Sequence, residues 1–330
     1  MLTRRRFNRL AAASALVPAL GGNALAQAPA QNWPNRVVRL VVPFTPGGGI
    51  DAVGRIMGAR LSEIWGQQVV VENKPGAGAN IGIEFVARAA PDGYTMLITA
   101  GGLTVNQYLF PSINYDPLAD FAPVTLICMF PNLLVVPKDS RFKSAGDIVA
   151  AAKTNPGKLT YASPGHGSSP HMSAELFKYM AKVDITHVPY RGAAPAITDL
   201  IAGRVDMTFA VMASGLPMVQ AGQLRALGVS TANRQESAPD VPAIGATGVP
   251  GYDTSSWFAF VVPAKTPPDI IRKMNADSRT VLAEPAIKAR LDKLGVIVVG
   301  STPEALGAHL KADAAKWGPV IKAANIKVSE

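Results

Sequence analysis

Apolar residues along this chain follow two alternating patterns, short continuous runs and longer segments with a helical period. The runs in the first half lie at 39–43, 69–72 and 94–99. Apolar positions recur every three or four residues from Ile50 to Ile64, and Asn80 can act as the N-terminal cap of a second helix. The order strand–helix–strand–helix–strand predicts an α/β unit with a parallel sheet.

The second half of the chain repeats this order. Its apolar runs lie at 159–162, 185–188 and 205–209. One helix is expected to begin at Pro170, because proline is favoured in the first helical turn, and another to end at Gly203. The period is far longer than that of a solenoid repeat. We therefore expect two similar lobes rather than an array.

Two further apolar runs, at 133–137 and 258–263, resemble each other and mark the passages between the lobes. The chain is expected to leave the first lobe near residue 130 and to return near residue 257. This assigns 33–130 plus 258–330 to lobe 1 and 131–257 to lobe 2. Two α/β lobes joined by two crossover strands form a hinge with a ligand cleft between them.

Two glycine-rich loops follow corresponding strands and open into helices. They read VPFTPGGGID at 42–51 and YASPGHGSSP at 161–170. A glycine-rich turn at a helix start leaves N–H groups unpaired at the positive end of the helix dipole, which makes an anion site. Loops at 72–82 and 189–194 occupy the same end of the predicted sheets, where open α/β proteins bind ligands. A ligand held at both ends, such as a small dicarboxylate, would suit this arrangement.

The N-terminus has the features of an export signal. An arginine-rich start with a twin-arginine pattern (3–9) precedes an apolar stretch at 10–20 and the small-x-small site Ala24-Leu25-Ala26. We expect residues 1–26 to be a signal peptide cleaved after Ala26, by the general or the twin-arginine route. The mature protein would then be exported to the periplasm.

Composition narrows the function further. The chain has 330 residues, 48% of them hydrophobic, which is enough for a large core in two lobes. Removal of the signal, with its four arginines, lowers the net charge from +9 to about +5, and the remaining basic residues are scattered. Scattered basic residues do not form the basic patch by which proteins bind nucleic acids. The single cysteine, Cys128, cannot form an internal disulfide and is expected to be a buried thiol.

Enzymatic alternatives find weaker support. An exported serine hydrolase could use Ser168 or Ser169 with His166 or His171, but the segment lacks the Gly-x-Ser-x-Gly elbow. The four histidines form no metal-ligand cluster, and neither a dinucleotide fingerprint nor a Walker motif is complete. We therefore expect no catalytic residue, no metal and no cofactor.

Several short motifs together carry a family resemblance. They are VPFxPGG at 42–48 with Asp51 and Arg55, VENKPGAG at 71–78 with Gly82, PDGYT at 91–95, VPYRG at 188–192, GRVD at 203–206 and PDVP at 239–242. The chain resembles the Bug family, the periplasmic solute receptors of tripartite tricarboxylate transporters. The resemblance extends over nearly the whole mature chain.

The resemblance implies an α/β, two-lobed type II periplasmic-binding-protein (Venus flytrap) fold. In that family, the loops after the first strand of each lobe hold a carboxylate, and Asn80 and Asp206 would face the same cleft. The expected ligand-binding residues are Phe44, Thr45, Gly47, Gly48, Gly49, Asn80, Ser163, Gly165, His166, Gly167, Ser168, Tyr190 and Asp206.

The expected function is therefore solute capture without bond chemistry. A monomeric receptor would bind a dicarboxylate, a tricarboxylate or an acidic amino acid and deliver it to the integral-membrane permease subunits of a tripartite transporter. An exported sensor that passes the same ligand signal to another protein is the alternative that sequence cannot separate from transport.

Overall fold

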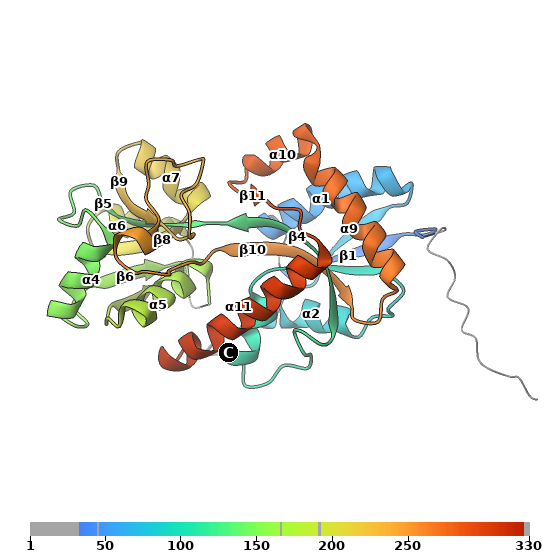
Figure 1. Ribbon diagram of the computed structural model, residues 1–330, viewed down its shortest axis with the longest axis horizontal. Helices are drawn as coiled ribbons and strands as arrows, with labels where there is room; N and C mark the ends of the chain where they lie inside the picture. Colours follow the sequence, from blue (N-terminus) through green and yellow to red (C-terminus); the bar gives the residue numbers. More distant parts are fainter. Residues whose placement is uncertain (1–32, 45, 166, 191–192, 327–330) are drawn as a thin grey trace, which may run out of the picture. The chain divides into compact units, whose positions relative to one another are not determined.

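A computed structural model describes residues 33–44, 46–165, 167–190 and 193–326 of the chain (Figure 1). Within these ranges the strands are β1 (Val38–Val42), β2 (Val69–Asn73), β3 (Thr95–Thr99), β4 (Phe121–Phe130), β5 (Asn132–Pro137), β6 (Thr160–Ser163), β7 (Thr186–Pro189), β8 (Met207–Val211), β9 (Leu224–Val229), β10 (Ser256–Pro263) and β11 (Ile297–Val298). The helices are α1 (Gly49–Trp65), η3 (Ala77–Ala79), α2 (Asn80–Ala87), α3 (Gly102–Leu109), α4 (Ala145–Thr154), α5 (Ser169–Ala181), α6 (Ala193–Ile201), α7 (Met212–Gln220), α8 (Ile244–Thr247), α9 (Pro268–Ala283), α10 (Pro285–Asp292) and α11 (Pro303–Ala323).

The predicted duplication is confirmed at the level of sheet topology. In the described residues, one sheet has the order β11-β4-β10-β3-β1-β2 and the other β7-β6-β8-β5-β9. In each sheet three parallel strands are followed by strands that pair antiparallel with their neighbours, and β1, β2 and β3 correspond to β6, β7 and β8. The expected two-lobed α/β fold is therefore correct.

Two passages connect the sheets (Figure 1). The first is short, because β4 ends at Phe130 in one sheet and β5 begins at Asn132 in the other. The second runs from the end of β9 to Ser256, where β10 enters the first sheet between β3 and β4. Buried hydrogen bonds tie the two passages together: the Asn132 amide donates to Ser230 Oγ at 2.8 Å, and Ser230 Oγ donates to the Thr254 carbonyl at 2.6 Å.

Helices cover both faces of the first sheet. Gly54 and Gly58 of α1 face β1 and β2, where an added Cβ would lie 3.4 Å from Val42 or Val69, at ordinary contact distance. On the other face, α2 and the first half of α11 pack over β3 and β4 and share a core with Trp257 of β10. The packing places the N-terminus of α2 beside the loop that follows β1, because Gly82 lies against Pro43 and the Lys74 carbonyl.

Helix α11 joins both cores. Leu306 and Leu310 in its first half pack in the core of the first sheet. Trp317, Val320 and Ile321 in its second half pack with α3 and with the buried residues of the second sheet. Helix α11 therefore packs against β4 of the first sheet and also contacts α5.

Candidate functional site

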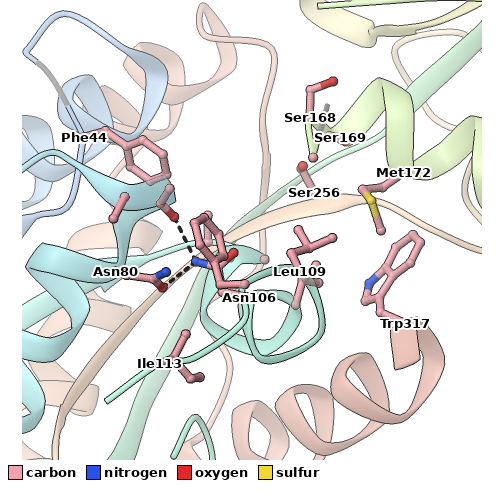
Figure 2. Close-up of a pocket in the computed structure, with 18 of the residues that line it drawn as sticks. Phe44, Asn80, Asn106, Leu109, Ile113, Ser168, Ser169, Met172, Ser256 and Trp317 are labelled. Atoms are coloured by element: carbon pink, nitrogen blue, oxygen red, sulfur yellow. Dashed lines mark hydrogen bonds between the residues drawn. The ribbon is translucent and has the colours of Figure 1, made fainter. Parts of the chain in front are cut away.

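A cavity with a volume of about 980 Å³ lies between elements of both sheets (Figure 2). The first sheet contributes Phe44 and the beginnings of α2 and α3. The second contributes the β6–α5 loop, and the segment 254–257 forms part of the wall. Trp317 of α11 also lines this space. The parallel strands of both sheets thus end at one cavity, as expected for open α/β folds.

Three helices begin at the cavity wall. Asn80 is the first residue of α2, Gly102 of α3 and Ser169 of α5, and all three line the cavity. In the part of the chain that the structure describes, the amides of Gly101, Gly102 and Ser169 donate to no protein acceptor. Helix N-termini present partial positive charge and free N–H groups, so this wall suits an anion.

Asn80 is fixed by two donors rather than acting as a helix cap. Ala79 is the N-terminal cap residue of α2, so the expected capping role of Asn80 is wrong. Instead, its Oδ1 accepts from Asn106 Nδ2 at 2.7 Å and from the Tyr115 hydroxyl at 2.8 Å. Asn106 also donates to the Gly78 carbonyl at 2.9 Å (Figure 2). Because both contacts use the oxygen of Asn80, its Nδ2 group is left as a donor for a ligand.

The β6–α5 loop brings three of the expected residues to the cavity: Gly165, Gly167 and Ser168. Gly165 and Gly167 have φ angles of 131° and 74°, which glycine adopts readily and other residues do not. Ser168 caps α5, accepting from the His171 amide at 3.4 Å, and donates to the Gly165 carbonyl at 2.7 Å. Ser163 is fully buried behind the loop, with its Oγ 2.6 Å from His187 Nε2.

The loop after β1 contributes Phe44 to the wall of the cavity. Gly47, Gly48 and Gly49 are not among the described residues that line it. The Gly47 amide donates to Asp51 Oδ2 at 3.0 Å. Asp51 is buried and also accepts from Arg55 Nε at 3.0 Å and Asn73 Nδ2 at 2.9 Å. The hydrogen bond from Arg55, with smaller contributions from Gly47 and Asn73, lowers the pKa of Asp51 to about 2.

Acid should remove the stabilisation that Asp51 provides. Folding lowers the pKa of Asp51 from 3.8 to about 2, so above pH 4 the ionised carboxylate adds about 2 kcal/mol to the free energy of unfolding. This stabilisation is lost as the pH falls toward 2. Urea unfolding of wild type and Asp51→Asn should differ by this amount at pH 6 and converge near pH 2. Asp92→Asn, at an exposed ion pair with Arg36, is the control. An Asp51→Asn curve parallel to wild type throughout would contradict this role.

Tyr190 and Asp206 lie away from the described lining. The Tyr190 hydroxyl donates to Asp199 Oδ2 at 2.8 Å, and desolvation with that contact raises its pKa. Asp206 precedes β8, at the strand end opposite the cavity, and accepts from the Thr160 amide and hydroxyl at 2.8 and 2.9 Å. Its carboxylate joins β6 to β8. The expected residues Thr45 and His166 lie outside the described residues.

The serines of the β6–α5 region have structural partners. The Ser168 hydroxyl donates its proton to the Gly165 carbonyl, and Ser169 Oγ accepts from Asn132 Nδ2 at 2.8 Å. His171 Nδ1 accepts from the Gly167 amide at 3.1 Å. These contacts describe a capped helix start rather than an activated nucleophile. No group of three or more potential metal ligands occurs in the described ranges, and no helix there is long and apolar enough to span a bilayer.

Several lining residues carried no sequence signal. Asn106 lies on a short helix of mixed composition, and Met172 lies one turn into α5. Asp313 and Trp317 come from α11. Asp313 accepts from the hydroxyl of Thr104, which lies 209 residues earlier in the chain, and from the Trp317 indole. The spacing of four residues between Asp313 and Trp317 predicts that they share one face of a helix. It does not predict that this face lies opposite α3.

Known proteins resemble this chain over most of its length. The sequence model of the tripartite tricarboxylate transporter family receptor matches residues 53–326. A UPF0065 protein in the tcbD-tcbE intergenic region of a Pseudomonas species is 41% identical over 290 residues, covering 88% of this chain and 86% of that protein. The structure of Rpa4515 from R. palustris with adipate has 39% identity and a TM-score of 0.74, covering 90% of this chain and all of that one. MatC from Rhodopseudomonas palustris with bound malate has 32% identity and a TM-score of 0.71, covering 88% and 100%.

Proposed function

The chain belongs to the family of tripartite tricarboxylate transporter receptors, periplasmic solute-binding proteins rather than enzymes, and on this premise we propose that it captures a small dicarboxylate in the cavity described above. The observation that carries the proposal is the convergence of the α2, α3 and α5 N-termini on one cavity. Among the described lining residues there is no Lys, Arg or His, so an anion would be held by backbone amides, by Asn80 and by neutral donors such as the hydroxyls of Ser255 and Ser256.

The apolar part of the lining favours a ligand with a hydrocarbon spacer. Phe44, Leu109, Met172 and Trp317 line the space between the helix starts of the two sheets (Figure 2). Polar hydroxyls of a citrate-like acid would lose hydration against these side chains, whereas methylene groups gain from burial. A linear dicarboxylate such as adipate, the ligand named for the relative Rpa4515, combines both requirements.

A ligand panel tests this proposal by thermal unfolding. Adipate, glutarate, malate and citrate would be compared, with adipamide as the uncharged control of the same length. At 100 times its Kd a ligand adds about 2.7 kcal/mol, so the Tm should rise by roughly 5–10 °C for the best dicarboxylate. Adipamide should leave it unchanged. A flat response to every carboxylate, with mass spectrometry showing ligand-free protein, would overturn the proposal.

We also propose how capture is completed. Lobe 1 (33–130 plus 258–330) and lobe 2 (131–257) would close over the ligand by bending at the two passages between the sheets. The closed receptor would then dock on a membrane permease, the partner implied by its family. Cleavage after Ala26 would deliver the mature protein to the periplasm, and an N-terminal sequence starting at Gln27 would verify this.

A further inference from the structure

Two histidines lie directly behind the β6–α5 loop, whose residues Gly165, Gly167 and Ser168 line the cavity. His171 belongs to the first turn of α5 and is 2% exposed, and His187 belongs to β7. Their rings lie 4.4 Å apart, centroid to centroid, at an angle of 30°. Neither belongs to the described cavity lining, so any effect on the ligand passes through the loop.

Each histidine is connected to the loop by a hydrogen bond. His171 Nδ1 accepts from the Gly167 amide at 3.1 Å, which requires an imidazole without a proton on that nitrogen. His187 Nε2 shares a hydrogen bond of 2.6 Å with Ser163 Oγ, and that oxygen accepts from the Gly165 amide at 3.1 Å. The two imidazoles therefore fix two amides whose glycines have positive φ angles and whose conformation shapes the wall of the cavity.

Among the described residues, the titratable groups beside the pair include Tyr161 of β6 and Glu175 and Lys178 of α5. The Tyr161 ring stacks on His187 at 4.6 Å and 11°, and its hydroxyl donates to Glu175 Oε1 at 2.5 Å. Glu175 also accepts from Lys178 Nζ at 2.8 Å. The Glu175 carboxylate is thus paired with a cation of its own helix and with the Tyr161 hydroxyl, and the two histidine rings lie side by side at 30° to each other.

From this arrangement we propose that His171 and His187 are positioning residues of the binding site, which hold the β6–α5 loop in its binding conformation while neutral and release it when protonated. The expected change in ligand affinity rests on the proposed function, whereas the expected change in the conformation of the loop does not. Protonation of His171 at Nδ1 would replace the acceptor of the Gly167 amide with a donor. Two imidazolium rings whose centroids lie 4.4 Å apart would also repel each other. Imidazoles gain this charge between pH 8 and 5, so the receptor would weaken its hold on the ligand as the surroundings acidify.

The Gly167 amide reports the loop directly, without any ligand. Its hydrogen-exchange protection factor, measured by NMR, should be high at pH 7.5 and fall at least about tenfold at pH 5.5. His171→Asn, whose Oδ1 can replace Nδ1 as an acceptor that does not titrate, should keep the protection at both pH values. His171→Leu should lose it at both. The Gly157 amide, which donates to the Asp184 carbonyl at 3.0 Å, is the internal control and should not change.

The outcomes separate a positioning role from a merely structural one. A Gly167 amide equally protected at both pH values in wild type, or protected in His171→Leu, would overturn the proposal. In calorimetry with adipate, wild type should lose at least about tenfold more affinity between pH 7.5 and 5.5 than His171→Asn does, since ligand protonation is common to both. Equal losses would contradict the link to binding. Absence of adipate binding by wild type at pH 7.5 would count against the proposed ligand, and the Gly167 protection would still decide the role of the histidines.

Discussion

Replacing Gly101 with tryptophan is expected to abolish carboxylate binding while leaving the fold intact. Gly101 lines the cavity at the start of α3, and a Cβ added there meets no atom within 4 Å. Its φ and ψ angles of −51° and −25° suit any amino acid, so the substitution introduces no backbone strain. An indole at this position would fill the space beside the Gly101 and Gly102 amides. Calorimetry should show at least a 100-fold loss of affinity, about 2.7 kcal/mol.

The matched variant is Gly101→Ala. A methyl group occupies little of a cavity of about 980 Å³, so affinity should remain within a few fold of wild type. Both variants should unfold within a few degrees of wild type. Binding by Gly101→Trp that equals wild type would show that the ligand sits elsewhere, and loss of binding in Gly101→Ala would point to an effect of the α3 backbone rather than of occupied volume.

The second large effect is expected from Ser230→Ala, where the two passages between the sheets meet. Ser230 is fully buried, and its hydroxyl both accepts from the Asn132 amide and donates to the Thr254 carbonyl. Alanine would leave two buried backbone groups without partners, which costs about 3 kcal/mol. The Tm should fall by roughly 6–12 °C.

Ser214→Ala is the control for this effect. Ser214 is partly exposed and donates to the Val211 carbonyl, so its loss should cost less than about 1 kcal/mol. Chemical denaturation of both variants gives the comparison. Equal stability of Ser230→Ala and wild type would mean that the buried hydrogen bonds contribute little, and bending at the passages would then have to be controlled by packing alone.

The layered fold could be predicted from sequence because its signals are local. The runs at 39–43 and 159–162 match β1 (Val38–Val42) and β6 (Thr160–Ser163) within one or two residues. Short continuous apolar runs bounded by Pro and Gly are typical of buried strands. The repeated order of strands then determined two sheets of the same topology. The length of β4 and the dual packing of α11 could not be predicted, because both depend on contacts between distant segments.

The candidate site was less accessible to sequence reasoning. Glycine-rich loops indicate where amides can face an anion, but not which amides are already used, as the Gly47 amide is by Asp51. Asp206 was placed in the cleft by resemblance, and in the structure it pairs with Thr160 at the other end of β8. Asn106 reaches Asn80 across 26 residues of chain, and neither a motif nor a period connects the two.

The position of β10 has a consequence for how the chain assembles. All strands of the second sheet come from one continuous stretch, Asn132 to Val229, so that half can complete its hydrogen bonds from local chain alone. The first sheet has β10 inserted between β3 and β4, although β10 follows the whole of the other sheet in sequence. As the chain is synthesised, the half that emerges first is therefore the half that finishes folding last. Until Ser256–Pro263 is made, its sheet lacks the strand between β3 and β4.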